Sequence, residues 1–278
     1  MRELYEVYLT YLKSNIKIIT NNAEVYRKVV YLYNELLSVE RNSFNNKITI
    51  YFQPESIRIL FEKMDIKTKP DGWLREFNRI LQNLIIKDSG SNYFFLHASG
   101  FSYDNKSYIF LGASHCGKTS CTMHNILKLN ASLLGDDYIV ISSKTFEINP
   151  FAELIHLKES SMKLFNDRLN FNDKGIKAGG IREKIYYFKT NELGIKKISK
   201  QINDPIVLIY PQFNSQNINR IAKLENLQNY TRLLRNTYNS SLTMQIILKW
   251  CQSNLIEEIY EVYYTSFEQL DRMMYKIL

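Results

Sequence analysis

The sequence is poor in the residues that mark disordered or cross-linked proteins. It holds 10 glycines, 5 prolines and 3 cysteines among 278 residues. So little glycine and proline excludes a collagen-like or linker-dominated chain, and a hydrophobic content of 45% can supply a core. The three cysteines form no CxxC pair, so they indicate neither a disulfide framework nor a zinc site. We therefore expect a globular cytoplasmic protein with reduced thiols.

Long apolar segments are also missing. No stretch approaches the roughly 18 uncharged apolar residues of a membrane span, and the first residues alternate charged and apolar side chains, unlike a signal peptide. Positive charge is in excess instead, because 36 Lys and Arg stand against 28 Asp and Glu and leave a formal net charge of +8. This surplus favours an anionic partner, such as a nucleotide, an acidic peptide or a nucleic acid, without selecting among them.

Hydrophobic periodicity divides the chain into two parts. Residues 1–90 are predicted to form a small α+β unit that opens with a β-hairpin and contains two amphipathic helices, the first capped by Asn22. In residues 91–278, strand, loop, helix and strand succeed one another, and the last helix begins in a capping box at Ser266. The first part carries no motif chemistry of its own.

A phosphate-binding motif lies in the second part. Residues 112–119 match the pattern G-x-x-x-x-G-K-[ST], with a predicted strand before them and a predicted helix after them. In this context backbone N–H groups and the helix dipole attract phosphate; Lys118 is expected to reach the β- and γ-phosphates, and the Thr119 hydroxyl to coordinate Mg²⁺. A chance match in a glycine-lysine turn is the alternative. The residues expected to contact the nucleotide are Gly112, Ala113, Ser114, His115, Cys116, Gly117, Lys118, Thr119 and Ser120.

Two adjacent carboxylates, Asp136 and Asp137, follow at a distance that leaves room for one helix and a return strand. A βαβ connection would bring them next to the phosphate loop. One carboxylate there can hold Mg²⁺ and the other can accept the proton of an attacking hydroxyl. The alternative is a tight turn with two solvated acids. His97 ends an earlier predicted strand, and by itself it is better explained as a structural histidine.

Three segments together resemble the core of the HPr kinase/phosphorylase-like kinases. They are residues 96–100 (LHASG), the loop at 112–119, and residues 134–138 (LGDDY), in this order and at similar spacing. The chain looks most like the compact members found beside peptide-modifying enzymes, including the lasso-peptide precursor kinases. The Arg-Gly-rich signature loop of the bifunctional enzyme is not found, so phosphorylase activity has no support.

The resemblance implies an α/β fold, with a P-loop kinase core of the HPr kinase/PEP carboxykinase-like type behind the small N-terminal α+β unit, and it implies ATP and Mg²⁺ as cofactors. Asp137 is similar to the family's proton acceptor for the substrate hydroxyl. Asp136 stands beside it as a metal ligand together with Thr119, and His97 is expected to face the γ-phosphate.

Two further residues depend on the resemblance. Glu159 is expected to be another Mg²⁺ ligand, although Glu153 fits the pattern equally well. Arg182 follows a pair of glycines in a basic segment and is a candidate phosphate clamp, against the alternative of a solvated basic loop.

The motifs and the resemblance together predict an ATP-dependent kinase that phosphorylates a hydroxyl. A Ser or Thr of a peptide or protein is the first candidate acceptor, including that of a ribosomal natural-product precursor peptide. A small-molecule hydroxyl kinase and a non-catalytic nucleotide-binding regulatory protein are the alternatives. No membrane or nucleic-acid partner is expected, because no nucleic-acid motif accompanies the charge. Self-association is expected by analogy with larger relatives.

Overall fold

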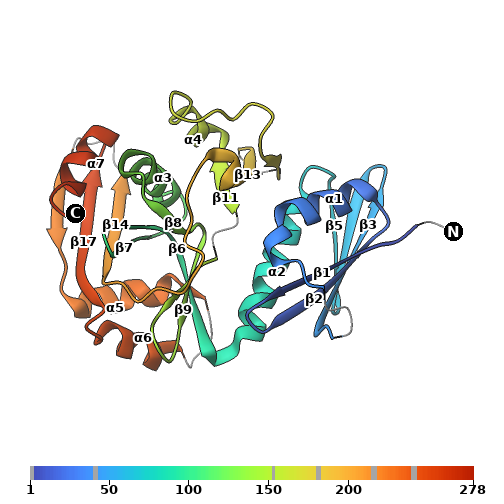
Figure 1. Cartoon of the computed structure of the whole chain (residues 1–278), viewed down its shortest axis with the longest axis horizontal. Coiled ribbons are helices and arrows are strands. Elements are labelled where there is room, and N and C mark those ends of the chain that lie inside the picture. Colours follow the sequence, from blue (N-terminus) through green and yellow to red (C-terminus); the bar gives the residue numbers. More distant parts are fainter. Residues whose placement is uncertain (1–2, 40–42, 152–153, 180–182, 214–217, 239–242) are drawn as a thin grey trace. The chain divides into compact units, whose positions relative to one another are not determined.

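The chain contains both helices and strands in the computed structural model, which describes residues 3–39, 43–151, 154–179, 183–213, 218–238 and 243–278 (Figure 1). This confirms the mixed α/β class. The chain separates into two units. The first consists of Met1–Gly90, His156–Asn166 and Asn170–Lys189, and the second of Ser91–Ile155, Asp167–Leu169 and Thr190–Leu278. None of the helices in the described ranges is long and apolar enough to cross a membrane.

The first unit is built on a five-stranded sheet in the order β1-β2-β3-β4-β5. Only β2 and β3 pair in parallel, whereas the neighbouring pairs are antiparallel. The predicted hairpin is present as β1 and β2, whereas the hairpin of β4 and β5 was not predicted. The strands are β1 (Tyr5–Tyr11), β2 (Ser14–Thr20), β3 (Asn46–Gln53), β4 (Ser56–Phe61) and β5 (Met64–Thr68).

Two amphipathic helices bury their apolar faces in this unit, as the periodicity predicts. They are α1 (Ala23–Leu32) and α2 (Trp73–Ser89). The predicted cap of α1 is confirmed, because Asn22 Oδ1 accepts hydrogen bonds from the backbone N–H groups of Glu24 and Val25, both at 2.9 Å. Capping satisfies donors that have no partner inside the helix, and so fixes where the helix begins.

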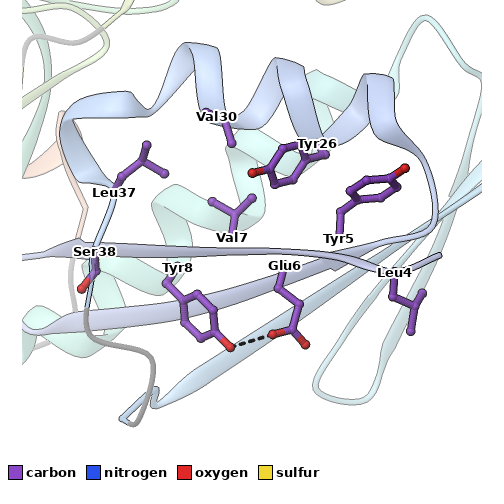
Figure 2. A pocket seen from close by; sticks show the side chains of 9 residues that line it. All are labelled: Leu4, Tyr5, Glu6, Val7, Tyr8, Tyr26, Val30, Leu37 and Ser38. Carbon is purple, nitrogen blue, oxygen red and sulfur yellow. Dashed lines mark hydrogen bonds between the residues drawn. The ribbon is translucent and has the colours of Figure 1, made fainter.

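A hollow of about 720 Å³ lies along β1 beside α1 (Figure 2). Aromatic and aliphatic side chains line much of it, including Tyr26 and Val30. Its carboxylate, Glu6, accepts a hydrogen bond from Tyr8 Oη at 2.8 Å and pairs with Lys17 Nζ at 2.8 Å. This carboxylate is therefore engaged, and the lining of the hollow mixes polar and apolar groups.

A small three-stranded sheet has the order β11-β13-β12, with bounds Leu154–Lys158, Ile185–Lys189 and Ile176–Lys177. The short helix α4 (Glu159–Lys163) follows β11. Within the first unit, two buried hydrogen bonds meet at Asn78 on α2. Tyr33 Oη, at the end of α1, donates to Asn78 Oδ1 at 2.9 Å, and Asn78 Nδ2 donates to Tyr187 Oη on β13 at 3.5 Å. Most of residues 156–189 thus belong to the first unit, although the sequence-based division placed them with the second part.

The second unit contains a larger mixed sheet, in the order β10-β9-β6-β7-β14-β17-β15, with β8 and β16 pairing to β6. β7 pairs in parallel with β14, and β14 with β17, which is typical of an α/β sheet. The strands are β6 (Tyr93–Tyr103), β7 (Lys106–Leu111), β8 (Ser132–Gly135), β9 (Tyr138–Ser142), β10 (Ile148–Asn149), β14 (Ile206–Phe213), β15 (Arg220–Lys223), β16 (Thr237–Tyr238) and β17 (Ile256–Tyr264).

Helices lie on both faces of this sheet (Figure 1). The helices α5 (Asn226–Arg235) and α6 (Thr243–Cys251) share one core with the sheet, in which Trp250 packs edge-on against Phe94 with ring centroids 5.3 Å apart. On the other face, α3 (Lys118–Leu129) contacts β6, β7 and β8. The last helix, α7 (Phe267–Met274), begins where predicted, because Ser266 Oγ accepts a hydrogen bond from Gln269 N at 3.3 Å.

The long strand β6 organises the functional part of the sheet. Its second half pairs with β7 and β8, and its first half with β9, in each case antiparallel. β7 and β8 therefore run in the same direction with β6 between them, and both end at one edge of the sheet. The return strand after α3 is thus not adjacent to β7, but the two residues between β8 and β9 still lie at the edge where β7 ends.

Candidate functional site

A tight loop joins the end of β7 to the start of α3. Its backbone takes positive φ at Gly112 (146°), His115 (72°) and Gly117 (97°), and Cys116 N donates to Ala113 O at 3.3 Å to close a turn. Glycine suits this curl because L-residues rarely adopt the φ of Gly112, and an added Cβ there would lie 2.8 Å from Cys116 Sγ. The loop leads directly into the N-terminus of α3, where backbone N–H groups and the helix dipole favour an anion.

Lys118 is the first residue of α3 and its ammonium folds back over the loop. Lys118 Nζ donates to Gly112 O at 2.8 Å and to Ala113 O at 3.0 Å, and the residue is only 8% exposed. Among the described residues no carboxylate pairs with this ammonium. A buried cation held only by neutral carbonyl groups is strongly attracted to an anion. The loop therefore fits a phosphate group.

Thr119 connects the loop helix to the acidic pair. Its Oγ1 donates to Asp136 Oδ1 at 2.7 Å, and Asp136 is 4% exposed. A hydroxyl and a carboxylate side by side are the oxygen ligands that Mg²⁺ takes in nucleotide sites, where one or two protein ligands are completed by phosphate oxygens and water. No cluster of three or more His, Cys, Asp or Glu side chains that could hold a metal ion occurs in the described ranges. Thr119 and Asp136 could supply two of the oxygen ligands of such a site.

Asp137 and His97 lie at the same edge of the sheet. Asp137 has a φ of 66°, and its carbonyl accepts a hydrogen bond from Ala98 N at 3.3 Å, which fixes the acidic pair against β6. The pKa of His97 is lowered by burial first and by the Lys118 ammonium second, and the Asp137 carboxylate partly offsets this. His97 therefore lies within electrostatic range of both groups and carries a neutral imidazole at pH 7.

The structure brings most of the predicted site residues together within the second unit. Ala113, Ser114, His115, Cys116 and Gly117 form the loop, Ser120 lies in the first turn of α3, and the remaining members are Gly112, Lys118, Thr119, Asp136, Asp137 and His97.

Glu159 belongs to the first unit, where its Oε1 pairs with Lys184 Nζ at 3.3 Å on the surface. Its role as a Mg²⁺ ligand stays a prediction. Arg182 and Glu153 lie outside the described residues, so the phosphate clamp and the alternative metal ligand stay predictions.

One set of contacts was not predicted from the sequence: residues at the end of β17 and in α7 contact α3, the helix that follows the loop. Tyr264, at the end of β17, places its hydroxyl 3.0 Å from Cys121 Sγ on α3 and 2.5 Å from the position that a Cβ on Gly117 would take. From α7, Asp271 binds His124 Nε2 at 2.7 Å and Lys128 Nζ at 2.8 Å. These contacts hold the first three turns of α3, and hence the loop, in one position.

A local sequence pattern could not reveal these contacts, because Cys121 and Tyr264 are 143 residues apart in the sequence. By itself, Tyr264 only fits the alternating pattern of a strand.

Comparison with protein-family models and with curated proteins finds no match for the chain. The resemblance to HPr kinase-like proteins therefore rests on the residues 95–142 alone and stays a prediction.

Proposed function

We propose that the chain is an ATP-dependent kinase with a P-loop core of the HPr kinase type, and that it transfers the γ-phosphoryl group to a Ser or Thr hydroxyl of a peptide or protein. The observation that carries the proposal is the hydrogen bond between Thr119 and Asp136. This bond connects the loop and Lys118 to the two adjacent carboxylates, Asp136 and Asp137. A site that only binds phosphate needs the loop, whereas phosphoryl transfer also needs a metal ligand and a proton acceptor beside it.

The binding role falls to the loop and to its lysine. When a nucleotide enters, the Lys118 ammonium would exchange its two carbonyl partners for phosphate oxygens, which hold a cation more strongly because they are charged. The Thr119 hydroxyl and the Asp136 carboxylate would hold Mg²⁺. Mg²⁺, when bound, offsets the negative charge of the phosphates.

The transfer role falls to Asp137. Its carboxylate would accept the proton of the acceptor hydroxyl as the new bond from that oxygen to the γ-phosphorus forms and the bond to the β-phosphate oxygen breaks, leaving ADP. His97 is neutral beside it, so its ring can donate one hydrogen bond without adding a charge that would compete with Lys118. Positioning and electrostatic stabilisation supply most of the catalysis in this class of reaction.

The proposal is tested by incubating the protein with Mg²⁺ and γ-labelled ATP, together with either a pool of Ser- and Thr-containing peptides or a pool of small alcohols and sugars, followed by mass spectrometry. We expect phosphate gain in the peptide pool. Gain only in the second pool would favour the small-molecule kinase. No gain in either pool, with ATP bound normally, would favour a nucleotide-binding regulatory protein.

Three variants assign the roles of the residues. Lys118→Met should lose at least tenfold in ATP affinity. Asp137→Asn should keep that affinity and lose about 10²- to 10⁴-fold in transfer, the usual contribution of a general base. Lys249→Met, which removes an exposed lysine of α6, serves as the matched control and should change neither. Unchanged turnover in Asp137→Asn would remove Asp137 from the mechanism.

A further inference from the structure

Two tyrosines adjoin the carboxylate that is proposed to receive the proton. The Tyr238 ring lies 5.1 Å from the Tyr138 ring and 5.8 Å from the His97 ring, measured between centroids. Tyr138 follows Asp137 directly in the sequence, and the Asp137 carboxylate acts electrostatically on the Tyr238 hydroxyl, whose pKa is raised mainly by burial. The three rings thus form a cluster within electrostatic range of Asp137, and neither tyrosine belongs to the nucleotide motif.

The backbone holds Tyr238 in this place. The short strand β16 pairs with β6, with Thr237 opposite Leu96 and Tyr238 opposite Phe95. The preceding residue, Asn236, accepts a hydrogen bond from His97 N at 2.7 Å. The end of α5 is fixed as well, because Thr237 Oγ1 donates to Leu233 O at 2.7 Å.

Tyr138 is fixed equally firmly, since it pairs with His97 across β9 and β6. Both rings are therefore preorganised, and an incoming group would find them in position.

The exposure and chemistry of the pair suit binding rather than packing. Tyr238 is 37% exposed and Tyr138 is half-buried, so part of their ring surface is open to a ligand. Burial raises the pKa of the Tyr238 hydroxyl and a hydrogen bond from Tyr138 only partly offsets it, so the group stays an uncharged phenol at neutral pH. Tyrosine rings offer a large apolar face with a polar rim, which is favourable for a partner of the same mixed character.

We propose that Tyr138 and Tyr238 form the acceptor subsite of the kinase, and that this subsite takes a hydroxyl whose neighbouring side chain is uncharged and apolar or aromatic. The inference rests on the proposed function, because it uses Asp137 as the proton acceptor. An acceptor hydroxyl must reach that carboxylate, and we expect the groups that flank the hydroxyl to lie against the neighbouring ring cluster. An acidic flank would face the carboxylates of Asp136 and Asp137 and is disfavoured, whereas an apolar flank buries its surface against the rings.

The experiment uses seven-residue peptides with a central Ser, flanked on both sides by Gly, Phe, Leu or Glu. Transfer from ATP·Mg²⁺ gives kcat and KM for each peptide, and fluorescence anisotropy of labelled Phe-flanked peptide gives its affinity in the presence of a non-hydrolysable ATP analogue. The proteins are the wild type, Tyr238→Leu, Tyr238→Phe and, as the matched control, Tyr275→Leu, which changes a tyrosine that is 86% exposed. ATP affinity is measured for all four.

The wild type should bind and phosphorylate the Phe- and Leu-flanked peptides at least tenfold better than the Glu-flanked peptide. Tyr238→Leu should raise KM for the Phe-flanked peptide roughly five- to tenfold, the effect expected for the loss of one aromatic contact, while ATP affinity stays within twofold. Tyr238→Phe should retain most of the preference, and the control should match the wild type.

Two results would overturn the subsite. In the first, Tyr238→Leu weakens ATP binding and leaves peptide KM unchanged, which would assign the rings to the nucleotide base. In the second, the wild type prefers the Glu-flanked peptide. Peptide binding that depends on Tyr238 without any phosphate transfer would refute the proposed kinase and keep the subsite, whereas transfer that ignores Tyr238 would refute the subsite and keep the kinase.

Discussion

Replacing Gly117 by alanine should damage the loop in two separable ways. Gly117 has a φ of 97°, a conformation that L-residues rarely adopt, and its added Cβ would lie 2.5 Å from the Tyr264 hydroxyl oxygen. The next atoms, Tyr264 Cζ and Cys121 Sγ, would lie at 3.8 and 3.9 Å, which are ordinary contacts. The steric conflict therefore involves one hydroxyl group.

The two effects can be given magnitudes. Backbone strain for a non-glycine residue at positive φ costs about 1–2 kcal/mol, and overpacking against a fixed side chain costs about 1–3 kcal/mol. Gly117→Ala should thus lower the free energy of unfolding of the second unit by about 2–5 kcal/mol. Gly194 is the matched control, because its φ is 68° and a Cβ there meets nothing within 4 Å. Gly194→Ala should show the backbone strain alone.

The assay is urea unfolding followed by tryptophan fluorescence. The chain has two tryptophans, Trp73 in the first unit and Trp250 in the second, so a Trp73→Phe background reports on the unit that carries the loop. Tyr264→Phe removes the conflicting oxygen, and in the double variant with Gly117→Ala it should recover about 1–3 kcal/mol. The reasoning is refuted if Gly117→Ala costs no more than Gly194→Ala, or if Tyr264→Phe recovers nothing.

Three further changes have definite expected outcomes. Asp271→Ala removes the partner of His124 and should lower the free energy of unfolding of the second unit by about 1–3 kcal/mol in the same urea assay; a loss below 0.5 kcal/mol would show that α7 does not hold α3. Burial and Lys118 lower the pKa of His97, so as pH falls below about 6.5 the unfolded chain takes up a proton there before the folded chain does, and stability declines. His97→Asn should reduce the slope of the urea midpoint between pH 5 and 7, and an unaltered slope would contradict this. Asp136→Asn should raise the Mg²⁺ concentration for half-maximal ATP binding at least tenfold, measured by titration with a fluorescent ATP analogue, and an unchanged Mg²⁺ dependence would exclude Asp136 as a ligand.

Local sequence patterns predicted the loop because its conformation depends on neighbouring residues. The strand before Gly112, the glycines themselves and the helix that starts at Lys118 all lie within a short stretch, and each is present. The acidic pair was predicted from the length of the connection, and Asp136 does contact Thr119. The assumed reason was incomplete, since β8 pairs with β6 rather than with β7.

Contacts between distant segments could not be predicted in the same way. Tyr264 occurs in an alternating, strand-like run, where an aromatic residue is equally consistent with a core position, and Tyr238 occurs in a short polar stretch. Nothing near either residue in the sequence identifies a partner on β6 or α3. The hairpin of β4 and β5 was missed because its turn has neither Gly nor Pro, although Glu62 adopts a positive φ of 49°. Side chains adopt such roles only when tertiary packing selects them.

The contacts from β17 and α7 also have a consequence for the order of events during protein synthesis. The ribosome makes the phosphate loop early, but Tyr264 and Asp271, which hold its helix, are added only after a further 143 residues or more. A nascent chain that lacks them has the whole nucleotide motif and no support for it. ATP should therefore bind poorly to growing chains and to truncated chains that end before residue 264. Binding of a nucleotide to the loop would then indicate that translation of this unit has been completed.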